Sequence, residues 1–217
     1  SGGKDSMALL AALAGLQRFY PKKFDIVPIH LQMGFPGSDD SNIRELCDAL
    51  HLPLVAVKTD IYEVVFEIRK EKSPCSLCAK LRRGALNNAA KELGCNTVAL
   101  GHHFDDAVET FMLNLFFEGR IGCFQPVTYL SRVDLRVIRP LLYTPEKEVR
   151  AFAATAELPV VESSCPANEN TERENMKQLL AQLERENIKE RTSLGKEARA
   201  KEGKYHGGGH PPLGYDY

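Results

Sequence analysis

The chain has 217 residues, of which 43% are hydrophobic and 26% charged, with a formal net charge of −1 at pH 7. Such a chain can bury one sizeable core, and its composition excludes disordered, collagen-like and wholly basic nucleic-acid-binding proteins. Its six cysteines are too sparse for a disulfide scaffold. No apolar stretch could span a membrane and no signal peptide is visible, so we expect a cytoplasmic protein.

The chain opens on a glycine pair that precedes an apolar run with a helical pattern over residues 5–19. Adjacent glycines let a backbone turn sharply and approach a ligand, and the helix N-terminus that follows favours an anion. The Walker pattern of P-loops is absent. We predict a phosphate-binding loop, although a glycine pair before a helix is equally typical of a plain tight turn. The loop residues are Ser1, Gly2, Gly3, Lys4, Asp5 and Ser6.

Helical and strand patterns alternate along the rest of the chain. Helices are expected over residues 41–50, 61–70, 75–93, 105–118 and 144–157, and strands over residues 24–31, 52–58, 97–101, 135–138 and 159–162. Such alternation predicts an α/β fold with a parallel sheet and helices on both faces. A phosphate loop of this kind should follow a central strand, so we expect the first strand to be missing from this chain.

A pair of cysteines, Cys75 and Cys78, stands at the start of the helix expected over residues 75–93. Residues at i and i+3 share one helix face, and a helix N-terminus favours thiolates. The pattern indicates a metal or sulfur centre, with a redox or incidental pair as the alternative. Cys165 is the natural third ligand, and three thiolates without a fourth ligand fit an open 4Fe–4S cluster better than structural zinc. Nearby basic residues, suited to a polyanion, are Lys80, Arg82 and Arg83.

The sequence GHHFDD, from Gly101 to Asp106, ends the strand expected over residues 97–101. Ligands of parallel sheets bind at that edge, and paired acids there can hold Mg²⁺ or accept a proton. An acid at a helix start is more often a cap, which is the role we expect for Asp105. Asp106 is the expected functional acid. Of the single cysteines, Cys47 and Cys95 are expected in the core, and Cys123 stays unassigned.

Taken in order, SGGKDS, CSLCAKLRRG, ALGHHFDDAVETFMLN, IRPLLY and the late Cys165-Pro166 pair resemble the tRNA 2-thiocytidine synthetases. These are PP-loop ATP pyrophosphatases, which split ATP into AMP and pyrophosphate. The resemblance covers about residues 1–180 and implies the same α/β fold. It also implies a homodimer that acts on tRNA and receives sulfur from a donor system such as a cysteine desulfurase.

The resemblance further implies a chemistry for the motifs. ATP would place its phosphates on the Ser1–Ser6 loop, and the C2 oxygen of a cytidine in the tRNA anticodon loop would be adenylated and then replaced by sulfur through the cluster. Lys4 would stabilise phosphate charge, while Asp5 and Asp106 would handle Mg²⁺ or protons. Further expected contacts are His30, Met33 and Gly101 for ATP, Cys75, Cys78 and Cys165 for the cluster, and Lys80, Arg82 and Arg83 for RNA.

Other functions share parts of this pattern. The related tRNA 2-thiouridine synthetases use the same cysteine design, but they carry flanking zinc modules, none of which follows Cys165. They also have a lysine, thought to be catalytic, where this chain has Arg82, which stays charged and is better suited to phosphate. A lysidine synthetase-like ligase would share the ATP loop and have no use for three cysteines. A zinc-bound tRNA-binding module is a non-enzymatic alternative.

Residues 181–217 differ in character from the rest. The strings LERENIKERT and GGGHPPLGYDY resemble the segment that links the catalytic and DNA-binding domains of large serine recombinases. We favour a chimera joined at a shared helical string over a mobile-element insertion or a real fusion, and a flexible polar tail is a further alternative. The expected domains are therefore residues 1–180, for ATP binding and thiolation, and a tail over residues 181–217 outside the core.

Overall fold

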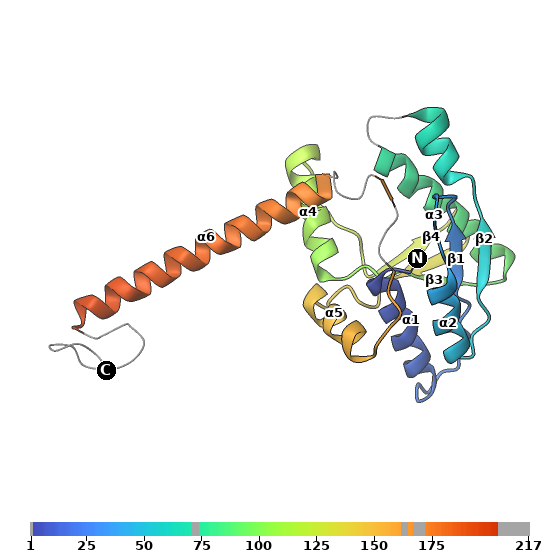
Figure 1. The fold of residues 1–217 in the computed structure, drawn as a ribbon, viewed down its shortest axis with the longest axis horizontal. Helices are drawn as coiled ribbons and strands as arrows, with labels where there is room; N and C mark the ends of the chain where they lie inside the picture. Colours follow the sequence, from blue (N-terminus) through green and yellow to red (C-terminus); the bar gives the residue numbers. More distant parts are fainter. Residues whose placement is uncertain (1, 71–73, 162–164, 167–171, 204–217) are drawn as a thin grey trace. The chain divides into compact units, whose positions relative to one another are not determined.

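The computed structural model describes residues 2–70, 74–161, 165–166 and 172–203 (Figure 1). Contacts divide the chain into two compact units, Ser1–Thr171 and Glu172–Tyr217. No helix in these described ranges is both long and apolar enough to cross a membrane.

The strands of the first unit form two sheets. In one, β1 (Ile29–Gln32) pairs in parallel with β2 (Val55–Lys58). In the other, β5 (Leu135–Ile138) lies between β3 (Thr97–Ala99), which is parallel to it, and β4 (Val127–Leu130), which is antiparallel. The predicted parallel pairing is confirmed for β1–β2 and β3–β5, and the antiparallel strand β4 was not predicted. This strand was missed because it is four residues long and pairs across a short turn.

Helices surround these strands (Figure 1). α1 lies against α5, and α3 lies against β1 and β3. The expected helix ends at Gly94 and Gly119 are confirmed, because both glycines follow a helix and have φ values of +72° and +62°, in the left-handed region. The helices are α1 (Lys4–Gln17), α2 (Ser41–Ala49), α3 (Pro74–Glu92), α4 (Phe104–Glu118) and α5 (Glu146–Thr155).

Three other expected elements differ in detail. The helical pattern over residues 61–70 is a π-helix, η1 (Glu63–Arg69). The strand expected from residue 24 begins only at Ile29, after Pro28, which lacks an N–H group but accepts a hydrogen bond from the Val55 N–H at 2.9 Å. Residues 159–161 form no regular strand, although the Val161 N–H donates to the Gly2 carbonyl at 2.9 Å; residue 162 lies outside the described ranges.

The core of the first unit consists of three apolar clusters. Met7 of α1 packs with three buried residues of α2, including Cys47, and this confirms the expected core position of Cys47. The second cluster includes Val98 of β3 and Leu135 and Val137 of β5. Cys95 is half-buried and packs against this cluster. The third cluster joins η1 and α3 through Ile61, Val65 and Cys78. α1 and α3, which carry the predicted phosphate and cysteine motifs, are therefore both anchored in the core.

The described part of the second unit is α6 (Glu172–Lys201), a helix of 30 residues, and the short turn after it. α6 continues without a break through residues 180 and 181, where the recombinase-like sequence was expected to begin. The GGGHPPLGYDY string lies outside the described residues. The domain division at residue 180 stays a prediction.

Candidate functional site

The predicted phosphate loop leads directly into α1. Gly3 is the N-cap, with extended backbone at φ −72° and ψ 157°, and its carbonyl accepts hydrogen bonds from the Ser6 and Met7 N–H groups at 3.1 Å. A Cβ atom on Gly2 would lie 3.2 Å from Val161 Cγ2, so the segment at Val161 leaves little room for a side chain there. The first N–H groups of a helix have no intrahelical acceptor, and this geometry suits an anion. Ser1 lies outside the described residues.

The GHHFDD segment follows β3 and lies against the first turn of α1. A Cβ atom on Gly101 would stand 2.8 Å from the Asp5 carbonyl oxygen and 3.2 Å from the Ser6 nitrogen. Glycine is thus required at Gly101 by close backbone approach. The structure therefore brings the two predicted motifs together at the carboxyl end of β3.

His103 links these two motifs and was not predicted as a site residue. Its side chain is almost fully buried, and its Nε2 atom lies 3.7 Å from Asp5 Oδ1 and 3.5 Å from Asp106 Oδ2. His103 is also the N-cap of α4: its N–H donates to Asp106 Oδ2 at 3.0 Å, and its Nδ1 accepts from the Asp106 N–H at 3.3 Å. Asp106 is therefore held in a capping box beside Asp5.

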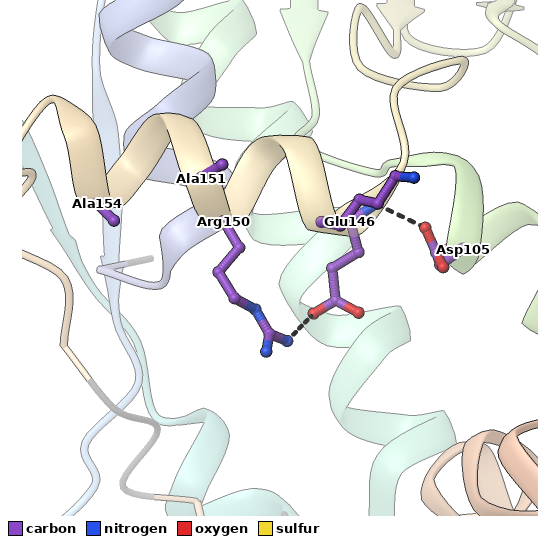
Figure 2. Close-up of a pocket in the computed structure, with 6 residues that line it drawn as sticks. Asp105, Glu146, Arg150, Ala151 and Ala154 are labelled. Carbon is purple, nitrogen blue, oxygen red and sulfur yellow. Dashed lines mark hydrogen bonds and ion pairs between the residues drawn. The ribbon is translucent and has the colours of Figure 1, made fainter. Parts of the chain in front are cut away.

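Asp105 has a different role from the one expected of it. Instead of capping its own helix, its Oδ2 atom accepts a hydrogen bond at 2.6 Å from the backbone N–H of Glu146, at the start of α5 (Figure 2). The N-cap of α4 is His103, with Asp106 as its partner in the capping box. A contact across 41 positions in the chain cannot be predicted from local sequence, so the role of Asp105 at the start of α5 was not predictable.

Glu146 contacts the phosphate loop as well as its own helix. Its Oε1 atom lies 2.9 Å from Lys4 Nζ and 3.0 Å from a terminal guanidinium nitrogen of Arg150 (Figure 2), and Lys4 Nζ is also 3.0 Å from Asp5 Oδ1. Burial alone would lower the pKa of Lys4, but the hydrogen bonds that Lys4 donates to Glu146 and Asp5 outweigh it and raise that pKa. Lys4 is therefore a fixed cation beside the predicted phosphate site.

The three predicted cluster ligands come from α3 and a later segment. Cys75 is exposed, Cys78 is buried and Cys165 is half-buried. Burial raises the pKa of Cys78, Arg82 opposes that rise, and the charges of Cys165 and Cys75 add to it. The charges of Cys75 and Cys165 thus act on Cys78, and the donor chemistry of three thiols fits a cluster with three cysteine ligands. Within the described residues, no three His, Cys, Asp or Glu side chains lie close enough together to hold a metal ion.

The predicted adenine contacts and RNA contacts lie on neighbouring elements. Met33, after β1, packs against the cluster of Ile61, Val65 and Cys78. His30 in β1 is half-buried, and burial lowers its pKa. The adenine segment and the cysteine helix thus share a core. The side chains of α3 that are exposed to solvent include Lys80, Arg82 and Arg83.

Comparison with known proteins agrees with this geometry. A model of the PP-loop domain family matches residues 1–184. The chain is 44% identical over 201 residues to a protein of Geobacter sulfurreducens named tRNA-cytidine(32) 2-sulfurtransferase, covering 89% of this chain and 77% of that one. A protein of the same name from Pelobacter propionicus is 41% identical, with coverage of 86% and 70%.

Among solved structures, the U34-tRNA thiolase NcsA of Methanococcus maripaludis, determined with its [4Fe-4S] cluster, matches with a TM-score of 0.70 and 25% identity. The match covers 86% of this chain and 64% of NcsA. The predicted α/β fold of the PP-loop ATP pyrophosphatases is thereby confirmed. This chain belongs to the PP-loop family, alongside the tRNA-cytidine(32) 2-sulfurtransferases.

Proposed function

We propose that this chain is an ATP-dependent tRNA sulfurtransferase that converts a cytidine of the anticodon loop to 2-thiocytidine. The observation that carries the proposal is the contact of the phosphate loop with the GHHFDD segment, where Gly101 lies against Asp5 and Ser6. Cysteines are also present at positions 75, 78 and 165, and a PP-loop ligase without a cluster would not need them. The named relatives, matched over more than two thirds of their length, support the same activity.

The phosphate loop would bind ATP through backbone N–H groups at Gly2, Gly3 and the first turn of α1. The C2 oxygen of cytidine would attack the α-phosphorus, and the bond to pyrophosphate would break. Lys4, held near this loop by Glu146 at 2.9 Å, would stabilise charge on the phosphates. We propose Asp5 and Asp106 as the groups that bind Mg²⁺ or accept a proton. The remaining residues of the proposed ATP site are Ser1, Ser6, His30, Met33 and Gly101.

Cys75, Cys78 and Cys165 are the residues that would hold a 4Fe–4S cluster. Three thiolate ligands leave one iron without a protein ligand, and the bound group would supply the sulfur chemistry there. This chain would contribute an apolar surrounding, because Cys78 packs with Ile61 and Val65, and such surroundings limit the access of water. AMP, carrying the original oxygen of cytidine, would leave as sulfur is bonded to C2.

The tRNA would contact α3 beside the cluster. Lys80, Arg82 and Arg83 are exposed on the same helix, and exposed cations suit the backbone of single-stranded RNA. A sulfur donor system, for which a cysteine desulfurase is our proposal, would renew the sulfide. We also propose that the protein is a homodimer and that it acts in the cytoplasm.

A second candidate is thiolation of uridine, because the matched structure is that of a U34-tRNA thiolase. A direct test supplies ATP, sulfide and the anaerobically reconstituted protein to two unmodified tRNA transcripts, one with cytidine and one with uridine at the target position. Nucleosides are then identified by mass spectrometry. We expect ATP-dependent 2-thiocytidine, and none with Cys165→Ala. Thiouridine alone would establish the second candidate, and no thiolated base with an intact cluster would refute the proposal.

A further inference from the structure

Arg139 follows β5 directly, at the sheet edge that also carries the GHHFDD segment. β5 and β3 are parallel neighbours, and the Leu100 N–H donates to the Ile138 carbonyl at 2.9 Å. The Arg139 N–H in turn donates to the carbonyl of Pro126 at 2.9 Å. The side chain of Arg139 therefore starts at the edge where the proposed reaction takes place.

The guanidinium of Arg139 lies on an aromatic side chain. Its carbon atom is 4.9 Å from the ring centre of Phe124, and His102 contacts the same ring with centroids 4.9 Å apart. One terminal nitrogen of Arg139 donates to the Gln125 carbonyl at 2.6 Å and to Thr128 Oγ1 at 3.3 Å. These contacts hold the guanidinium in one position, as a fixed recognition group requires.

The charge of Arg139 is not neutralised within the described part of the chain. No carboxylate there lies within ion-pairing distance of it, and its Nε atom is buried without a hydrogen-bond acceptor. Burial lowers the pKa of Arg139, the charge of Cys123 opposes that lowering, and the charge of Arg83 on α3 adds to it. Arg139 is half-buried, so a guanidinium that is held in place without a carboxylate beside it indicates a site for an anion that comes from outside the chain.

We propose that Arg139, supported by Phe124, binds a backbone phosphate of the substrate RNA beside the nucleotide that is modified. The inference rests on the proposed function, which supplies the RNA. A phosphate presents pairs of acceptor oxygens that the planar fork of a guanidinium can bind. The same chemistry is present in ATP. RNA is the better match because the charge of Arg83 acts on Arg139, and Arg83 is one of the exposed cations of α3 that we propose for RNA, whereas we assign the ATP phosphates to the loop that carries Lys4.

The test compares binding of RNA and of ATP in matched variants. Arg139→Met removes the charge and keeps an apolar contact with Phe124, and Arg139→Lys keeps the charge without the planar fork. Arg136→Met is the control, since Arg136 is an exposed arginine of β5, the strand that Arg139 follows. Fluorescence anisotropy with an unmodified tRNA transcript, over a range of salt concentrations, gives the affinity and its salt slope; calorimetry gives the affinity for ATP.

We expect Arg139→Met to weaken RNA binding about tenfold and to reduce the salt slope by about one, as the loss of a phosphate contact should. Arg139→Lys should retain the slope with reduced affinity, and Arg136→Met should bind as wild type does. ATP affinity should not change in any variant. If Arg139→Met does not fold, as judged by its melting curve, Arg139→Lys carries the test.

Three results would overturn the inference. If both Arg139 variants bind RNA with wild-type affinity, Arg139 contributes only to packing and does not bind a phosphate of the RNA. If the Arg139 variants lose affinity for ATP and still bind RNA as wild type does, the phosphate that Arg139 binds belongs to ATP. A wild-type protein that does not bind tRNA would refute the proposed function itself, and with it this inference.

Discussion

Gly101 and Asp5 come so close together that a Cβ atom on Gly101 would lie 2.8 Å from the carbonyl oxygen of Asp5. The atom in the way is backbone, in the first turn of α1, and cannot rotate aside as a side chain would. The end of β3 thus fixes where α1 begins. It thereby also positions the N–H groups that we propose for phosphate binding.

Gly101→Ala should therefore displace the start of α1. We expect a lower melting temperature and a weaker affinity for ATP, both measurable on the purified protein by differential scanning calorimetry and equilibrium dialysis. Gly15→Ala, in the same helix, is the matched control. No atom lies within 4 Å of the Cβ position at Gly15, and alanine in a helix interior stabilises by about 1 kcal/mol relative to glycine. Equal effects of the two substitutions would contradict this explanation.

Lys4 and Glu146 form an ion pair whose contribution to stability should depend on pH in a defined direction. The pKa of Lys4 is raised above its ordinary value of 10.5, so the folded state holds the proton more tightly than the unfolded state does. The stabilisation is therefore fully present below pH 10.5 and is lost as the pH rises through the raised pKa.

Glu146→Gln should reveal this dependence. We expect it to lower the free energy of unfolding by about 1 kcal/mol near neutral pH, and the difference from wild type should shrink at strongly alkaline pH. Urea denaturation at a series of pH values measures both. Arg150→Gln removes the exposed partner of Glu146 and should cost less. A difference that grows with pH would show that the sign is wrong.

Asp105 and Asp106 are adjacent acids with separable roles. Asp105→Ala should lower the free energy of unfolding by about 1 kcal/mol, as the loss of a helix cap does, because the N–H of Glu146 loses its acceptor. Asp106→Asn should reduce pyrophosphate release from ATP far more strongly than Asp105→Asn does, because Asp106 faces His103 beside Asp5. Chemical denaturation and a pyrophosphate assay test the two statements. Equal activity of the two asparagine variants would remove Asp106 from the proposed site.

Local sequence patterns were sufficient for α1 to α5 and for the glycine turn that precedes α1. Helical periodicity followed by Gly94 or Gly119 marks helix ends, because glycine alone adopts a positive φ without strain. Parallel strand geometry predicted that GHHFDD would lie at the carboxyl edge of the sheet, and the structure places it there, against the first turn of α1. The approach of a ligand to the adjacent glycines stays a prediction.

Contacts between distant segments could not be predicted in this way. The acid at position 146 resembles any acid in the first turn of a helix, and only the packing of α1 against α5 places it beside Lys4. His103 looks in sequence like its neighbour His102, yet one caps α4 and the other contacts Phe124. Strand β4 is only four residues long, and so short a run of strand-favouring residues does not by itself indicate a strand.

The most direct test of the account is the iron and acid-labile sulfide content of the chain after anaerobic reconstitution, in wild type, Cys165→Ala and the control Cys95→Ala. Cys95 packs against a different apolar cluster from the one that holds Cys78. The account predicts about four irons and four sulfides per chain in wild type and in the control, and loss of the cluster in Cys165→Ala. Zinc instead of iron, or a cluster retained in Cys165→Ala, would contradict it.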